Sequence, residues 1–416
     1  MPSDAHDAAH EAIDAVFRIE SPKLIASLAR ITRDVGVAEE LAQDALVTAL
    51  EQWPRTGIPD RPGAWLMQAA KHRAIDFVRR GQLLERKHEQ LGHELGAPAD
   101  PSEALVEALD DELGDDLLRL IFTSCHPVLS PEARVALTLR LVGGLSTEEI
   151  ARAFLVPVQT IQQRIVRAKK QLAEAHVPFE VPRGDDLAPR LASVLEVLYL
   201  IFNEGYAATS GDDWVRPELC EDALRLGRVL ARLAPGLAEV HGLVALMEIQ
   251  ASRLRARVGP NGEPILLLEQ NRARWDRLLI RRGLESLARA QAIGGGVYTL
   301  QAAIAACHAR ADKASDTDWR AITTLYEQLA RIAPSPIVEL NRAVAVGMAE
   351  GPAAGLAIAD RLEEALGNYY LLPSVRADLL TKLGRTAEAR VELARAAELT
   401  GNARERQLLL DRAAKL

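Results

Sequence analysis

Apolar residues recur at the spacing of amphipathic α-helices through residues 10–87, with predicted breaks at Pro22 and at the Pro- and Gly-rich run 53–63. A second helical pattern fills residues 115–177 and ends where Pro and Gly become frequent again. The segment between them, residues 88–114, contains many acids and no Lys or Arg. The pattern therefore predicts two small helical domains joined by an acidic linker.

The larger part of the chain follows these two domains, and its pattern is helical as well. We expect a helical extension domain at residues 186–310, with a small β-hairpin where Asn261-Gly262 separates two short apolar runs. Arg342 and Arg376 illustrate an offset of 34 residues, the period of tetratricopeptide repeats. We therefore predict an all-α chain whose residues 317–416 form tetratricopeptide-like stacked helices.

Composition supports an all-α chain with several cores, because the 416 residues are 48% hydrophobic but only 4% aromatic. The net charge is −8, from 50 Lys and Arg against 58 Asp and Glu. This balance argues against a protein that coats nucleic acid or anionic membranes through bulk charge. Any contact with nucleic acid is therefore expected to come from a local patch.

The three cysteines are widely spaced and include no Cys-x-x-Cys pair, so we expect no disulfide framework, no metal site and no cofactor. We interpret the pairs Cys125-His126 and Cys307-His308 as incidental. The acidic segment 1–14 lacks the apolar core of a signal peptide, and the most apolar stretch, residues 191–202, is too short to cross a bilayer. These features favour a soluble protein of the reducing cytoplasm without membrane contact.

The segment 145–172 has the spacing of a helix-turn-helix. Ser146 and Glu149 predict a capping box on a short helix, and Pro157 is placed to open the next helix after a tight turn. An ordinary surface helix is the alternative, but capping box, turn length and segregated polarity together favour a helix that reads base edges and binds phosphates. The face opposite the apolar stripe carries Gln159, Gln163, Arg167 and Lys170, with Arg164 at its border.

Two further helices of the first domain have opposite charge. Residues 37–50 place Glu40, Gln43 and Asp44 beside an apolar stripe, which suits a basic protein partner or simply a solvated face. Residues 61–87 carry seven bases and two acids, so phosphate binding is plausible there. Trp65 of this helix could stack on an unpaired base, but its spacing favours a place in the core.

With these motifs in order, the two domains resemble the second and fourth conserved regions of bacterial sigma factors of the extracytoplasmic-function type. Residues 38–45 resemble the helix that grips the clamp helices of RNA polymerase, which implies core binding by Glu40, Gln43 and Asp44. The helix from Ala64 resembles the one that engages the minus-ten promoter element, and the helix-turn-helix is similar to the minus-thirty-five reader. The residues implied for the minus-ten element are Arg61, Lys71, His72, Arg73, Arg79 and Arg80. Those implied for the minus-thirty-five element are Gln159, Thr160, Gln163, Arg164, Arg167 and Lys170.

The rest of the chain resembles the carboxy-terminal extension of the sigma subgroup that carries tetratricopeptide-like repeats. This resemblance implies that control is built into the chain, with a small YCII-related protein or a small ligand as a further partner. The polar clusters on which this resemblance rests could line a pocket or form a buried network between helices. The residues of this candidate pocket are Asn203, Glu204, Tyr206, Arg274 and Trp275.

The leading hypothesis is a sigma factor that brings RNA polymerase core to specific promoter DNA, with no catalysis of its own. The alternative is a helix-turn-helix regulator whose repeat domain senses an effector and which acts without the polymerase. The acidic-flanked helix followed by a Trp-bearing basic helix favours the first, since a simple regulator needs neither. An enzyme at residues 186–310 is disfavoured, because that region lacks a nucleophile elbow, a metal-ligand helix and a phosphate loop. We expect the extension to be a scaffold needed for activity.

Overall fold

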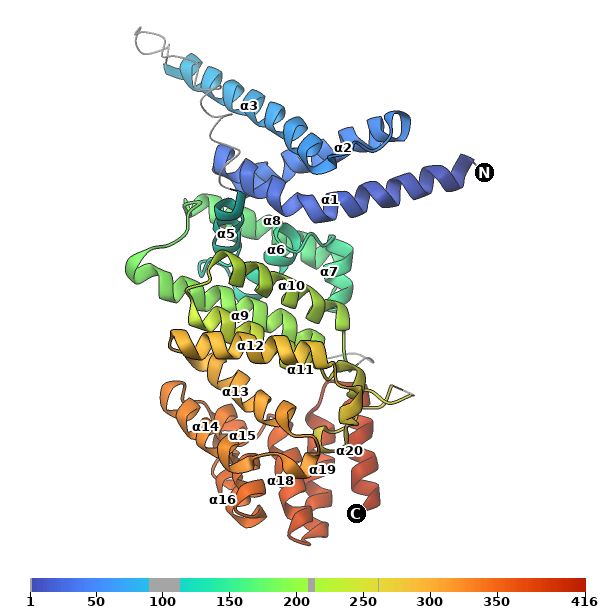
Figure 1. Ribbon diagram of the computed structural model, residues 1–416, viewed down its shortest axis with the longest axis vertical. Helices are drawn as coiled ribbons and strands as arrows, with labels where there is room; N and C mark the ends of the chain where they lie inside the picture. Colours follow the sequence, from blue (N-terminus) through green and yellow to red (C-terminus); the bar gives the residue numbers. More distant parts are fainter. Residues whose placement is uncertain (1, 90–112, 209–213, 261) are drawn as a thin grey trace. The chain divides into compact units, whose positions relative to one another are not determined.

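The computed structural model describes residues 2–89, 113–208, 214–260 and 262–416, and it is all-α in these ranges, which confirms the predicted fold class (Figure 1). The chain divides into two compact units, residues 1–197 and residues 198–416. None of the helices in the described part is long and apolar enough to span a membrane. Most of the predicted acidic linker lies outside the described residues.

The first unit begins with three helices, α1 (Pro2–Thr32), α2 (Val35–Thr56) and α3 (Pro62–Glu89). Asp34 caps α2 by accepting hydrogen bonds from the backbone amides of Gly36 and Val37. The predicted break at Pro22 is wrong, because α1 continues through it and buries Leu24 and Leu28 on the following turns. Packing of these side chains outweighs the local penalty of a proline inside a helix.

Residues 113–174, which are described throughout, contain four helices: α5 (Leu113–Ser124), α6 (Pro131–Leu141), α7 (Thr147–Ala153) and α8 (Val158–Glu174). The capping box of α7 is confirmed, since Ser146 and Glu149 each accept a hydrogen bond from the other's backbone amide. Leu155 turns the chain between α7 and α8 with a φ of 51°, a conformation that few non-glycine residues adopt. The predicted apolar stripe of α8 is buried, at Ile161, Ile165, Ala168 and Leu172.

After a short 3₁₀ turn, η1 (Gly184–Asp186), the chain enters α9 (Leu187–Tyr206). The division between the two units falls inside this helix, between Val197 and Leu198. Arg134 of α6 donates hydrogen bonds to Ser193 and Glu196, which lie in the first half of α9. The amino-terminal half of α9 is therefore anchored in the first unit, although the sequence predicts that the extension starts at residue 186.

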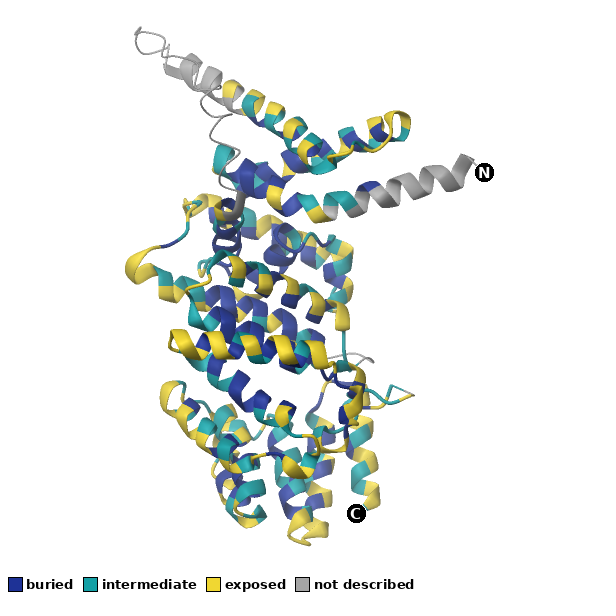
Figure 2. Ribbon diagram, viewed as in Figure 1, coloured by how far each residue is buried: buried dark blue, intermediate teal, exposed yellow. Residues whose placement is uncertain are grey.

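The second unit contains eleven further helices in its described part, besides the second half of α9. They are α10 (Pro217–Leu233), α11 (Ala238–Ala251), α12 (Arg277–Ile293), α13 (Val297–Arg310), α14 (Trp319–Ile332), α15 (Pro336–Ala349), α16 (Pro352–Asp360), α17 (Glu363–Leu366), α18 (Leu371–Lys382), α19 (Thr386–Leu399) and α20 (Ala403–Lys415). Helix α11 is buried on nearly all sides, because α10, α12 and α13 pack around it. Helix α10 instead buries one stripe and exposes the rest of its surface (Figure 2).

The predicted β-hairpin reduces to a single antiparallel bridge between Val258 and Pro264. This bridge lies in an irregular segment that joins α11 to α12 and contains three short 3₁₀ turns. The turns are η2 (Leu254–Ala256), η3 (Leu267–Glu269) and η4 (Arg272–Arg274). Backbone hydrogen bonds from Gly259 N–H to Glu263 O and from Ile265 N–H to Arg257 O flank this bridge.

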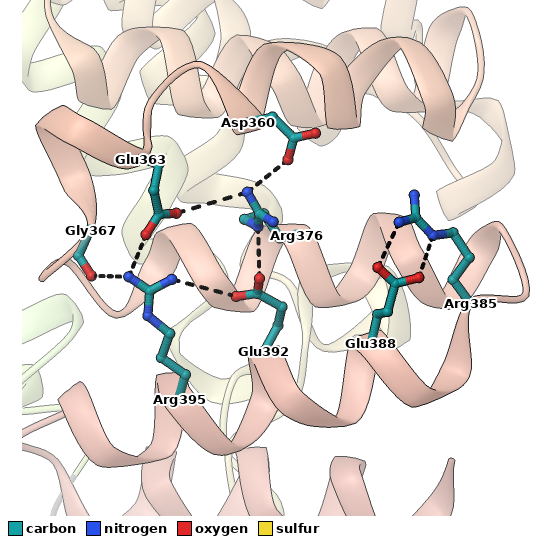
Figure 3. Close-up of polar contacts among 8 residues, drawn as sticks. All are labelled: Asp360, Glu363, Gly367, Arg376, Arg385, Glu388, Glu392 and Arg395. Carbon is teal, nitrogen blue, oxygen red and sulfur yellow. Dashed lines mark hydrogen bonds and ion pairs between the residues drawn. The ribbon is translucent and has the colours of Figure 1, made fainter.

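Helices α15 and α16 pack together, as do α18 and α19, in two successive hairpins. The 34-residue offset places Ala343 of α15 and Ala377 of α18 at fully buried positions. Arg376 of α18 joins the two hairpins, since its guanidinium lies 2.7 Å from Asp360 and 2.9 Å from Glu392 (Figure 3). Its counterpart Arg342 instead pairs within its own helix, so the two repeats differ in their polar contacts. The tetratricopeptide-like assignment stays a prediction.

Candidate functional site

The outer face of α8 is available to solvent, as the helix-turn-helix prediction requires. Thr160 and Arg164 are half-buried at the edge of this face. Lys170 lies 3.5 Å from Glu174, an exposed pair one turn apart that restricts the Lys170 side chain little. The helix therefore presents amide and cationic groups on the side opposite its buried stripe. The exposed residues are Gln159, Gln163, Arg167 and Lys170.

The basic helix α3 also exposes part of its predicted face. Arg61, His72 and Arg79 are exposed, and Lys71 is half-buried. The side chain of Arg80 lies outside the described residues. This helix begins beside the end of α2, where Trp53 is buried and contacts Trp65 edge-on with ring centroids 5.2 Å apart. Trp65 is half-buried in this contact, as the core interpretation expects.

Arg73 connects α3 to α2 and is half-buried there. It donates a hydrogen bond of 2.7 Å to the hydroxyl of Thr48, and its guanidinium lies 3.5 Å from the carboxylate of Asp44. One residue predicted to contact DNA is thus paired with one predicted to contact the polymerase. Glu40 and Asp44 are exposed and Gln43 is half-buried, so the predicted acidic face of α2 reaches solvent.

The sequence prediction missed Glu39, whose side chain is buried on α2 with 4% of its surface exposed. Its carboxylate accepts hydrogen bonds from Arg140 Nε at 2.6 Å and from Gln43 Nε2 at 3.1 Å. Lys169 of α8 completes the group through an ion pair. An acid beside the apolar stripe of α2 was a usable signal, but nothing in the sequence pointed to its partners.

A second buried carboxylate, Asp116 of α5, has 1% of its surface exposed and holds two cations. Arg30 Nε of α1 lies 3.0 Å away and Arg119 Nη1 lies 2.6 Å away. Burial raises the pKa of Asp116, and the two arginines oppose this effect. Asp116 and Glu39 therefore both tie the α1–α2 hairpin to the helices around the helix-turn-helix.

The candidate pocket residues of the second unit do not all come together. Tyr206 is buried and Asn203 is exposed, and both line a cavity of about 360 Å³. Glu204 instead pairs with Arg216, and Arg274 is exposed. Trp275 is buried in the core of this unit.

Three residues that the sequence did not single out, Gln250, Arg253 and His308, also line this cavity. Burial lowers the pKa of His308 to about 4, so its imidazole is neutral at neutral pH. In the described part of the chain, no three His, Cys, Asp or Glu side chains gather as ligands for a metal ion. Burial raises the pKa of the Cys125 thiol to about 11. The thiol is therefore protonated at neutral pH, and the reactive thiolate form is rare.

Comparison with protein families places known domains on both halves of the first unit. Residues 16–83 match the family described as Sigma-70 region 2, and residues 119–172 match Sigma-70, region 4. Residues 190–291 match a family of unknown function, DUF6596. No solved structure matches the chain.

Similar proteins cover either the whole chain or its first part. An uncharacterised protein of Rhizobium meliloti, R00370, is 44% identical over 94% of this chain and 93% of its own length. The probable ECF RNA polymerase sigma factor SigI of Mycobacterium tuberculosis is 25% identical over 41% of this chain and 58% of its own length. The ECF RNA polymerase sigma factor SigK of Mycobacterium bovis is 31% identical over 34% of this chain and 74% of its own length. With both sigma regions present in order, the chain belongs to the ECF RNA polymerase sigma factors, which direct promoter-specific transcription.

Proposed function

We propose that this protein binds RNA polymerase core through the acidic face of α2 and reads two promoter elements through α3 and α8. The exposed amides and cations of α8 are the observation that carries the DNA part of this proposal. We assign base reading to Gln163 and phosphate binding to Lys170, because amides discriminate bases whereas a lysine contacts the backbone as a point charge. Glu40, Gln43 and Asp44 offer carboxylate and amide groups to a basic partner helix.

We further propose that the arrangement of the first unit is a closed state. Promoter elements at minus ten and minus thirty-five are about 25 base pairs apart, roughly 85 Å of B-form DNA at 3.4 Å per base pair. In the first unit, α3 is tied to α2 through Arg73 and Thr48, and α2 is tied to α8 through Glu39 and Lys169. Because α3 and α8 are both tied to α2, they cannot contact two elements that lie so far apart. The contacts of Glu39 therefore have to open before both elements are read.

The extension is proposed to control this opening as a tetratricopeptide-like scaffold that is needed for activity. Helix α9 supports the proposal, because it continues from the first unit into the second without a break. Arg134 of α6 holds Ser193 and Glu196 of that helix. A change in the second unit that moves α9 is thereby transmitted to α6, whose Arg140 holds Glu39. A small ligand or a YCII-related protein that binds the extension would act through this path.

A helix-turn-helix regulator that works without the polymerase is the second candidate. The exposed face of α8 favours this candidate, because its amides and cations can contact duplex DNA without another subunit. Run-off transcription with purified core polymerase separates the two functions. A sigma factor makes core enzyme start at a specific site, whereas a regulator alone does not.

The first prediction tests core binding. The double variant Glu40→Lys, Asp44→Lys should weaken binding to purified core polymerase at least about tenfold, since it replaces attraction to basic groups by repulsion. Asp185→Lys with Asp186→Lys, two exposed acids of η1, is the matched control and should bind normally. Undiminished binding of the α2 variant, with its helical circular dichroism intact, would show that the core-binding face lies elsewhere.

The second prediction tests the division of labour on α8. Lys170→Ala should weaken binding of core-bound protein to all promoter variants by a similar factor and reduce its salt dependence. Gln163→Ala should change the order of preference among variants of the minus-thirty-five element, by about 1–3 kcal/mol at the affected base. Arg310→Ala removes an exposed cation from the second unit as a control. Equal, uniform losses in both α8 variants would contradict the assignment.

The third prediction concerns the closed state. Glu39→Gln leaves Arg140 and Lys169 without their counter-charge, which should destabilise the contact by about 1–3 kcal/mol. We expect faster amide exchange in the first turns of α2 and in α8, together with more run-off transcript per molecule. Glu174→Gln, an exposed acid of α8, is the control. If exchange rises but transcription falls, the closed arrangement is the active one and the proposal is wrong.

The fourth prediction tests the role of the extension. A chain ended at Tyr206, the last residue of α9, keeps the contacts of Arg134 and the complete first unit. If the extension is a required scaffold, this fragment should show native-like helical dichroism and bind core polymerase, yet give little promoter-specific transcript. A folded fragment that transcribes as well as the full chain, or better, would instead identify the extension as dispensable or inhibitory.

A further inference from the structure

The cavity of about 360 Å³ in the second unit lies among α9, α11, α13, α14 and α15. This volume is in the range of sites for small organic ligands. Asn203 and Asn341 are exposed, and most of the other lining residues are aromatic or aliphatic. The apolar residues include Tyr199, Phe202, Leu246, Ile249, Ile304 and Leu329.

Arg253 is the one residue among those that line this cavity whose side chain is charged at neutral pH. It is buried, with 8% of its surface exposed. Its Nη2 donates hydrogen bonds to the hydroxyl of Tyr206 and to the side-chain carbonyl of Gln250, and both partners are neutral. Among the described residues, no carboxylate forms an ion pair with Arg253. A buried cation without a counter-charge is costly, so its presence in a cavity calls for an explanation.

The neighbours of Arg253 hold it in place and add positive charge. Its guanidinium lies 5.7 Å from the ring centre of Tyr206 and 5.6 Å from that of Trp275. Arg257 lies over the same Tyr206 ring at 3.8 Å, and Arg272 over the same Trp275 ring at 4.8 Å. Arg253 thus lies beside two aromatic rings, each of which also contacts a second arginine.

The other titratable groups of the cavity do not neutralise this charge. Arg253 and Arg272 act together with burial to lower the pKa of His308. Burial raises the pKa of Tyr326 to about 12, so its phenol stays protonated. Both side chains are neutral hydrogen-bonding groups at neutral pH. The described cavity wall therefore combines one fixed cation, neutral polar groups and a large apolar surface.

We propose that this cavity binds a small organic monoanion, a carboxylate with an aromatic or aliphatic body, whose carboxylate contacts Arg253. Nη2 already donates to Tyr206 and Gln250, so Nη1 is the amino group that donates to the carboxylate. Such a charge-assisted hydrogen bond is strong where water is excluded. The body of the ligand packs on Phe202, Leu246 and Ile249. Ligand binding at this site would be a function of the extension in addition to its proposed role as a scaffold.

The test uses the full chain and four probes in isothermal titration calorimetry at neutral pH: benzoate, octanoate, and their neutral amides, benzamide and octanamide. The carboxylates should bind at least about tenfold more tightly than the amides of the same shape, because only they form a charge-assisted pair with Arg253. Equal binding of acids and amides would overturn the proposal. So would binding of inorganic phosphate without binding of either carboxylate.

Arg253→Met separates a ligand-binding role from a structural one. It should abolish the preference for carboxylates and leave the unliganded protein as stable as before or more stable, because it removes a buried uncompensated charge. Arg255→Met, an exposed neighbour in η2, should change neither property. If Arg253→Met keeps the preference for carboxylates, the proposal is wrong. If that variant fails to fold, the comparison of acids and amides on the unaltered chain decides.

Discussion

The buried carboxylate of Glu39 joins parts of the first unit that lie far apart in the sequence. Removing the charge of Glu39 leaves the half-buried cations Arg140 and Lys169 without compensation, at a cost of about 1–3 kcal/mol. Arg140 of α6 and Lys169 of α8 both depend on it. The helices that carry the proposed core-binding and DNA-reading faces, α2 and α8, are therefore held together by this contact. A protein that has to place these faces on separate targets needs this contact to be reversible.

Helix α9 extends the same coupling toward the extension. Arg134 holds its first half in the first unit, and its second half contributes Tyr199, Phe202 and Tyr206 to the cavity of the second unit. A ligand on Arg253 would change the surroundings of Tyr206, whose hydroxyl oxygen accepts a hydrogen bond from that arginine. One continuous helix thus lines the cavity and contacts α6, and the control that we propose for the extension would act along this helix.

Local features of the site were predictable wherever neighbouring residues decide the structure. The capping box at Ser146 and the buried stripe from Ile161 to Leu172 follow from helical periodicity, and both are confirmed. Pro22 shows the limit of such reasoning, because burial of Leu24 and Leu28 outweighs a local helix breaker. The hairpin expected near Gly262 is reduced to one bridge, between Val258 and Pro264.

The sequence by itself determined the helical class, the helix-turn-helix and the family resemblance, because these depend on the order and spacing of residues along one chain. Only the tertiary structure decided the partners of Glu39, Asp116 and Arg253. An acid or an arginine in a helix looks the same in sequence whether it reaches solvent, closes an ion pair or faces a cavity. Its role is set by which groups from distant segments approach it once the apolar faces are buried, and that approach is a property of packing rather than of local pattern.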